Sequence, residues 1–392
     1  MKLENHLVKK SAMTKEKRKV LVVERLMLHY RIPLYEQLRL ELANRDVLLE
    51  LLYGEGTSAE KSKKDDVTLD WARKIPTKYW LGGRVCWQPY EEEARKADLV
   101  VVMHENKMLF NLWLMLCDRP ARLAFWGHGK NFQSRNPNGI KERFKKWTTN
   151  KVDWWFTYTE AGARLVEVAG FPRERITVVN NASDTRLLAK QCASYAREGQ
   201  SALRRKYGLP DAPTGVFIGS LYADKRIDFL LDAACRIRAG IPDFHLLVCG
   251  AGPQEELVRA AASRHDWIRY LGISHDEAKA RALAMSDLML NPGMVGLGVL
   301  DSFASGKPMF TTDNAFHSPE IDYLQHGCNG IIAGNDVDSF SQAVIAILRE
   351  PARLERLSAS ALECATRYTI ENMAERLANG IVSCLGYPAF KL

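Results

Sequence analysis

Residues 291–308, NPGMVGLGVLDSFASGKP, carry the residue types best suited to chemistry in this chain. They follow a short apolar run, and their pattern predicts a buried strand end, a turn at Gly296 and a helix from about Leu297 to Ser305. The first turn of such a helix offers unpaired N–H groups and the positive end of the helix dipole, which suit a diphosphate. Asp301 lies beside the apolar stripe, where a carboxylate can accept hydrogen bonds from sugar hydroxyls. Alone, the stretch is equally well explained as an ordinary strand-to-helix turn.

A second candidate is the segment GSLYADKR, from Gly219 and Ser220 to Lys225 and Arg226, which follows an apolar run at 216–218. Two adjacent cations at the entry of a helix can neutralise a diphosphate without a metal ion. A solvated basic pair matched by neighbouring aspartates is an equally good explanation of these residues alone.

Two further side chains follow expected strands. His128 stands between two glycines after the apolar run 123–126, where its imidazole can hydrogen-bond a reacting sugar or simply be satisfied by the local backbone. Glu320 follows the run 309–311, and we expect it either to contact the same ligand as residues 291–308 or to serve as a cap or surface residue. Both positions correspond to the strand ends at which an α/β protein binds its ligands.

Short apolar runs alternate with segments of helical period, and this alternation begins again after residue 211. It predicts two α/β domains of the doubly wound, Rossmann-like type, which face one another across a cleft. We expect a basic disordered arm at 1–18, a first domain at 19–190, a second domain at 191–365 and a final helix within 366–392 that packs back toward the first domain. The ligand crevice is expected at the carboxyl ends of the strands, between the domains.

The net charge of +8 is unevenly distributed, because the surplus of Lys and Arg lies in residues 1–190. A basic first domain suits an anionic membrane surface or a lipid pyrophosphate, and the segment 140–155 (IKERFKKWTTNKVDWW) mixes cations with aromatic residues in the same way. The chain has no recognised nucleic-acid motif, so nucleic acid is not an expected partner. Its eight cysteines show no metal-ligand spacing, which predicts a reducing compartment and no metal site. No apolar run is long enough to span a bilayer.

These segments, in this order, resemble the retaining glycosyltransferases of family 4, which have the GT-B fold. The family's second domain typically contains G-R-L-x-x-x-K-G, G-x-G-P, E-x7-E before A-x-G-x-P, P-E-I and N-G. Here the corresponding stretches are GSLYADKR, GAGP, GMVGLGVLDSFASGKP, SPEI and CNG. The resemblance is most specific from Gly219 to Gly330 and extends more weakly over the first half, where Gly127-His128 matches the family's active-site histidine.

The resemblance implies a role for several residues. Lys225 would contact the donor diphosphate together with Arg226 and the amides of Val295, Gly296 and Leu297, and Asp301 would bind the nucleotide ribose. This chain departs from the family at Gly293, which stands where the first glutamate of E-x7-E orients the transferred sugar. It also has Ser220 in place of an arginine and Arg226 in place of a glycine, and we expect Arg226 to supply the missing positive charge.

The function implied is a metal-independent hexosyltransferase without a cofactor. It would move a sugar from a nucleotide diphosphate sugar to a glycan or lipid-linked acceptor during synthesis of a cell-surface polysaccharide or glycolipid. We expect it in the cytoplasm, peripherally at the inner face of the cytoplasmic membrane. Two alternatives remain open at this point: a nucleotide-sugar epimerase on a similar scaffold, and a non-catalytic partner subunit that binds a nucleotide sugar.

Overall fold

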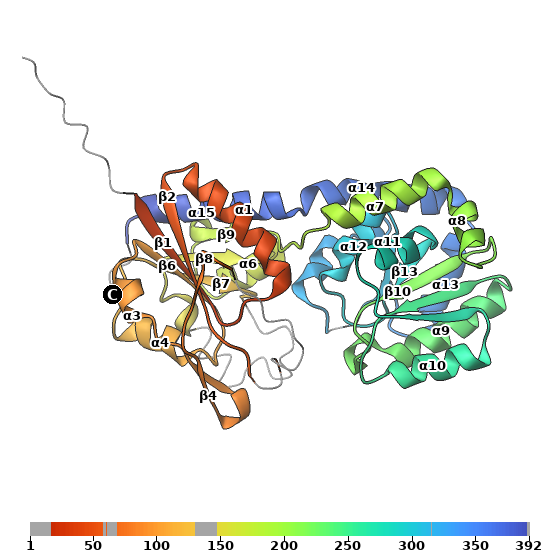
Figure 1. Ribbon diagram of the computed structural model, residues 1–392, viewed down its shortest axis with the longest axis horizontal. Helices are drawn as coiled ribbons and strands as arrows, with labels where there is room; N and C mark the ends of the chain where they lie inside the picture. Colours follow the sequence, from red (N-terminus) through yellow and green to blue (C-terminus); the bar gives the residue numbers. More distant parts are fainter. Residues whose placement is uncertain (1–16, 58–59, 61–68, 130–146, 315, 390–392) are drawn as a thin grey trace, which may run out of the picture.

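The computed structural model describes residues 17–57, 60, 69–129, 147–314 and 316–389. Two lobes lie beside one another, each built on its own sheet (Figure 1). Most of the expected arm at 1–18 and part of the aromatic and basic segment at 140–155 fall outside the described residues. The two Rossmann-like sheets confirm the predicted fold class.

The first sheet contains seven parallel strands in the order β3-β2-β1-β6-β7-β8-β9. Their bounds are β1 Arg18–Glu24, β2 Val47–Tyr53, β3 Arg73–Lys74, β6 Leu99–Met103, β7 Leu123–Gly127, β8 Trp154–Thr157 and β9 Ile176–Val178. Strands β6 and β7, near the centre of this sheet, are buried along their whole length because helices cover both faces of a parallel sheet. These helices include α1 Ile32–Ala43, α3 Glu91–Arg95, α4 Leu109–Leu116 and α6 Glu160–Val168.

The second sheet contains six parallel strands in the order β12-β11-β10-β13-β14-β15. Their bounds are β10 Thr214–Ile218, β11 His245–Cys249, β12 Ile268–Gly272, β13 Leu288–Leu290, β14 Met309–Thr312 and β15 Gly330–Ala333. The surrounding helices are α7 Arg186–Glu198, α8 Gln200–Lys206, α9 Ile227–Gly240, α10 Glu255–Arg264, α11 Asp276–Ala284, α12 Gly298–Ser305 and α13 Val337–Leu348. The expected helix after Gly296 is therefore α12, and Gly306 ends it in a left-handed conformation at φ 65°.

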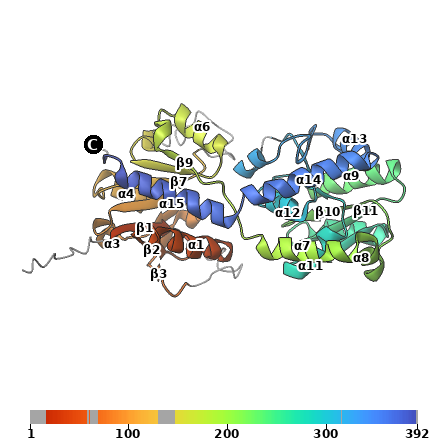
Figure 2. The same ribbon diagram turned by 90° about the horizontal axis from the view of Figure 1, so that it is seen from above.

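The last part of the chain is divided into two helices. It forms α14 Pro351–Arg367 and α15 Ile370–Gly386, and the Thr369 hydroxyl caps α15 by accepting the Asn372 amide at 3.1 Å. Helix α14 packs on α12 of the second lobe, whereas α15 crosses to the first lobe and packs on α1 (Figure 2). Helices α14 and α15 together therefore connect the two lobes.

Both sheets change winding direction between two central strands, at β1 and β6 in the first and at β10 and β13 in the second. Loops that leave the carboxyl ends of such strands turn to opposite sides of the sheet and leave a crevice between them. In the second lobe these are the loops after β10 and β13, which contain the two motifs singled out from the sequence. A small antiparallel hairpin, β4 Lys78–Trp80 and β5 Val85–Trp87, stands outside both large sheets.

Candidate active site

The loops after β10 and β13 pack against each other so closely that Gly293 has no room for a side chain. A Cβ at this position would lie 2.3 Å from the main-chain oxygen of Asp224 and 2.5 Å from the carbonyl carbon of Lys225. The Met294 amide donates a hydrogen bond to the same Asp224 oxygen at 2.8 Å. The loop after β10 therefore occupies the space into which the family's first glutamate would project, and Gly293 contributes backbone only.

The turn at 293–297 is fixed by His317. The sequence pattern predicts a role for Glu320 nearby and gives no signal for His317. The Val295 amide donates to His317 Nδ1 at 3.0 Å, and His317 Nε2 lies 2.8 Å from the Thr312 carbonyl oxygen. A neutral imidazole with its proton on Nε2 satisfies both contacts, and burial lowers the pKa of His317 in agreement with that form. The Val295 amide is thus already used, contrary to its expected role toward phosphate.

The next two amides remain available. No described residue accepts a hydrogen bond from the main-chain N–H of Gly296 or Leu297, and α12 begins without a side-chain cap. A Cβ added at Gly298 would meet no atom within 4 Å, so the space in front of this first turn is open. An uncapped helix start with open space in front of it suits an anion.

Lys225 lies beside this turn. Its ammonium donates a hydrogen bond to the main-chain oxygen of Met294, and no described carboxylate lies within 4 Å of Nζ. Burial lowers its pKa to about 8, despite the opposing effect of Asp224. A half-buried ammonium without a carboxylate partner is well placed to neutralise an incoming anion.

Arg226 makes different contacts from Lys225, although the two are adjacent in sequence. Its backbone is left-handed, at φ 55° and ψ 53°, a conformation that glycine adopts readily. Its guanidinium donates hydrogen bonds to the Pro292 oxygen, directly before the 293–297 turn, and to Thr312 and Asn335. Gly219 and Ser220 lie at the base of the same loop, where Gly219 packs tightly against Gly250.

Asp301 faces a cavity of about 470 Å³ that includes residues of both lobes. The cavity lining includes Tyr30 and Pro33 from the first lobe and Lys279, Leu297, Gly298 and Asp301 from the second. Asp301 Oδ1 forms an ion pair with Lys279 Nζ at 2.9 Å. The sequence does not predict this pair, because Lys279 lies on α11 and Asp301 on α12. One carboxylate oxygen is thereby held, and no described residue donates a hydrogen bond to the other.

The two remaining predicted side chains, His128 and Glu320, come from different lobes. His128 is exposed at the end of β7, with its ring centroid 4.6 Å from that of Tyr158. Glu320 is buried between the lobes, where its Oε1 accepts a hydrogen bond from Asn181 Nδ2 at 2.6 Å, and Asn181 Oδ1 in turn accepts from Arg31 at 3.2 Å. Glu320 is therefore part of the contact between the lobes, which corrects its expected place beside the donor.

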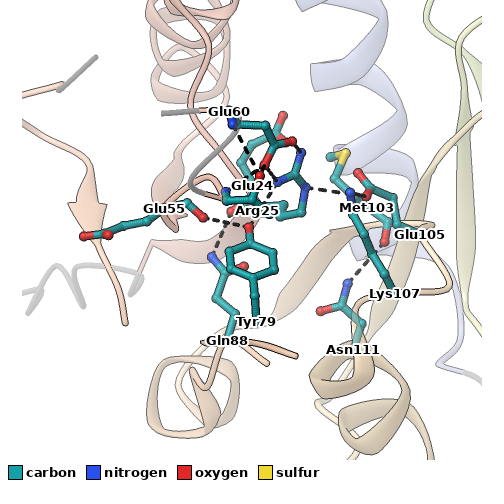
Figure 3. Close-up of polar contacts among 11 residues, drawn as sticks. Glu24, Arg25, Glu55, Glu60, Tyr79, Gln88, Met103, Glu105, Lys107 and Asn111 are labelled. Atoms are coloured by element: carbon teal, nitrogen blue, oxygen red, sulfur yellow. Dashed lines mark hydrogen bonds and ion pairs between the residues drawn. The ribbon is translucent and has the colours of Figure 1, made fainter. Parts of the chain in front are cut away.

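A polar cluster centred on Arg25 lies directly after β1 in the first lobe (Figure 3). Its guanidinium binds Glu60 at 2.7 Å and the Tyr79 hydroxyl at 3.0 Å, and lies 3.6 Å from Glu105. Burial raises the pKa of Glu60, but hydrogen bonds from Arg25 and Thr57 outweigh burial and lower this pKa to about 2. Carboxylates held ionised at a strand end can accept hydrogen bonds from the hydroxyls of a polar acceptor.

Among the described residues, no group of three or more His, Cys, Asp or Glu side chains is arranged to hold a metal ion. At the 293–297 turn, Lys225, the start of α12 and the amides of Gly296 and Leu297 supply positive charge.

The chain is similar in sequence to known proteins, and the similarity includes the lobe that holds the 293–297 turn. The family described as Glycosyl transferases group 1 matches residues 212–350, which include the whole second sheet. The D-inositol 3-phosphate glycosyltransferase of Thermobispora bispora is 27% identical over 322 residues, covering 78% of this chain and 69% of the relative. The alpha-D-kanosaminyltransferase of Streptomyces kanamyceticus is 24% identical, covering 76% and 81%.

Solved structures show the same fold. Anabaena HepE in complex with UDP aligns with a TM-score of 0.67 at 15% identity, covering 93% of this chain and all of that one. Sucrose-phosphate synthase from Thermosynechococcus elongatus aligns with a TM-score of 0.64 at 15% identity, covering 94% and 99%. The predicted family is confirmed for the second lobe: residues 212–350 match the group 1 glycosyltransferases, and the chain has the GT-B fold.

Proposed function

We propose that the protein transfers a sugar from a nucleotide diphosphate sugar to a lipid-linked or glycan acceptor, with retention of configuration at the anomeric carbon. The observation that carries the proposal is the turn at 293–297. Here the Lys225 ammonium has no carboxylate partner and two amides have no acceptor among the described residues, and the uncapped start of α12 lies near the carboxylate of Asp301. This arrangement complements a nucleoside diphosphate, with the phosphates at the turn and the ribose hydroxyls at Asp301.

The residues would act on the leaving group. The bond between the anomeric carbon and the diphosphate oxygen breaks, the acceptor oxygen forms the new bond, and the acceptor proton passes to the departing diphosphate. Lys225 and the amides of Gly296 and Leu297 would stabilise the negative charge that develops on the diphosphate. His128, at the carboxyl end of β7, would contact the reacting sugar. We propose that no metal and no resident cofactor are needed, because these groups supply the positive charge.

The acceptor would bind to the first lobe. Relatives include the D-inositol 3-phosphate glycosyltransferase of Thermobispora bispora, whose named acceptor is a phosphorylated polyol. The cluster around Arg25 combines the ionised carboxylate of Glu60 with a guanidinium and a phenol hydroxyl, groups that suit a polyol or glycan. This supports an acceptor with several hydroxyl groups.

We propose that the protein binds its acceptor at an anionic membrane surface. At the tip of the β4–β5 hairpin, which projects from the first lobe (Figure 1), Trp80 is 48% and Leu81 75% exposed. Lys78 and Arg84 flank this tip without an ion pair to any described residue, and residues 71–90 include no Asp or Glu. An exposed tryptophan and leucine beside unpaired cations suit the headgroup region of an anionic bilayer. No described helix has both the length and the apolar composition needed to cross a bilayer.

A transfer assay tests the proposal. The purified protein is incubated with nucleotide sugars labelled in the sugar, with EDTA, and with or without a membrane lipid and glycan extract. We expect labelled glycoside to form only when the extract is present, with unchanged yield in EDTA and with the anomeric configuration of the donor. Release of free sugar without an acceptor would instead favour an epimerase, and product of inverted configuration would overturn retention.

A further inference from the structure

A second cavity, of about 540 Å³, borders the start of the proposed donor turn. It shares no described lining residue with the cavity that Asp301 faces: Met294 lines this cavity, whereas Leu297 lines the one shared by the two lobes. Its lining consists of Ala223, Asp224, Arg226, Met294, Asn314, Phe316 and Asn335. If the ribose is held at Asp301 and the phosphates at Leu297 and Gly296, the next group along the donor, the sugar, reaches this cavity.

Arg226 is the cation of this cavity, and it has no carboxylate partner among the described residues. Its Nη1 donates to the Pro292 oxygen at 3.3 Å, to Thr312 Oγ1 at 3.2 Å and to Asn335 Oδ1, all of them neutral acceptors. The guanidinium carbon lies 4.0 Å from the centroid of the Phe229 ring, which fixes the plane of the group. A guanidinium held in this way is pre-organised for an anion.

Part of its hydrogen-bonding capacity is unused. No described residue accepts a hydrogen bond from Nε or Nη2 of Arg226, and these two donors form one edge of the guanidinium fork. A carboxylate can accept two parallel hydrogen bonds from such an edge. Asp224 also lines the cavity, but its side chain is exposed to solvent and makes no ion pair with Arg226.

At positions 293 and 226, the charges of this chain differ from those of the family 4 motifs that it resembles. Gly293 removes a carboxylate that would accept hydrogen bonds from a neutral sugar, and its space is filled by the backbone of Asp224 and Lys225. Arg226 adds a fixed positive charge where glycine is usual. A site that has lost an anion and gained a cation favours an anionic sugar over a neutral one.

We propose that the transferred sugar is a hexuronic acid, whose carboxylate binds the free edge of the Arg226 guanidinium. This inference rests on the proposed function, since it assigns the sugar of the same donor. Asn314 and Asn335 line the same cavity and offer amide groups to the remaining sugar hydroxyls.

The test compares two donors that differ only at the sugar's carboxylate, by calorimetric titration. The pair is UDP-glucuronate and UDP-glucose if UDP binds, or GDP-mannuronate and GDP-mannose if GDP binds. The proteins are the wild type, Arg226→Gly, Arg226→Lys and the control Arg236→Gln. Glycine suits the left-handed backbone at 226, so Arg226→Gly should fold, and its unfolding midpoint verifies this. Arg236 is an exposed cation of the same helix, about 15 Å further along it.

We expect the wild type and Arg236→Gln to bind the acidic donor at least tenfold more tightly than the neutral one, which corresponds to about 1.4 kcal/mol. Arg226→Gly should lose this preference while its affinity for the free nucleotide stays unchanged, and Arg226→Lys should keep part of it. Equal affinities in the wild type, or a preference that survives in Arg226→Gly, would overturn the inference and leave the transferase proposal intact. If no free nucleotide binds, the donor site itself fails, and this inference fails with it.

Discussion

Lys279 Nζ and Asp301 Oδ1 lie 2.9 Å apart and join α11 to α12 at the edge of the cavity between the lobes. The pair holds one oxygen of the carboxylate and leaves the other for a ligand. Asp301 is thus oriented before any nucleotide arrives, a condition that reduces the cost of binding.

The first prediction ranks these two residues. Asp301→Ala should weaken nucleotide affinity more than tenfold, because hydrogen bonds to a charged acceptor contribute about 1.5–3 kcal/mol. Lys279→Gln should weaken affinity only a few-fold, because an amide can still hold the carboxylate in place. Isothermal titration with the free nucleotide measures both, and equal losses in the two variants would show that Asp301 does not contact the ligand directly.

The second prediction concerns pH. Because the free site loses the Lys225 proton as the pH rises through about 8, whereas a bound diphosphate keeps the ammonium charged, affinity should be constant up to about pH 7 and fall above about pH 8. The fall should approach tenfold per pH unit. Lys225→Arg should give a flat profile, since the guanidinium stays charged. A wild-type profile that is flat between about pH 7 and pH 9.5 would remove Lys225 from the phosphate site.

The third prediction separates Glu320 from donor binding. Glu320→Ala leaves the buried Asn181 amide without its acceptor and should lower the free energy of unfolding by about 1–3 kcal/mol. Glu320→Gln keeps an acceptor oxygen and should cost less. Denaturant unfolding measures both effects, and nucleotide affinity should be unchanged in Glu320→Gln. A tenfold loss of affinity in that variant would return Glu320 to the donor site.

The repeated α/β fold could be predicted from sequence because short apolar runs and helical periods are local signals. The turn before α12 was also visible, since glycines and a helix start mark it. The contacts that shape the site were not. His317 meets the Val295 amide, and Asn181 meets Glu320 across 139 positions of sequence. Such pairs depend on how the loops of neighbouring strands and the two lobes come together.

Arg226 illustrates the same limit. Its sequence neighbour Lys225 suggests a shared role at the diphosphate, whereas in the structure Lys225 bonds the Met294 oxygen and Arg226 bonds Thr312 and Asn335. The closure of the space at Gly293 by the Asp224 backbone is equally invisible in the sequence, because it depends on two loops that are 69 positions apart.

The fourth prediction tests the hairpin. The double variant Trp80→Ser/Leu81→Asn should reduce sedimentation with vesicles that contain anionic lipid at least tenfold, because two apolar side chains no longer enter the headgroup region. Asparagine tolerates the positive φ of 52° at position 81, so the hairpin should keep its shape. Val168→Ser, which changes an 80% exposed apolar residue on α6, is the matched control. Equal sedimentation of all three proteins would place membrane contact elsewhere or exclude it.

The most direct test of the donor site is thermal unfolding of the wild type and Asp301→Ala in the presence of UDP, GDP and dTDP. A nucleotide at about a hundred times its Kd should stabilise the folded protein by about 2.7 kcal/mol. We predict that one nucleotide raises the midpoint of the wild type and that Asp301→Ala loses most of this shift. If none of the three moves the wild-type midpoint, the 293–297 turn is not a nucleotide site, and the proposed transfer from a nucleotide sugar is contradicted.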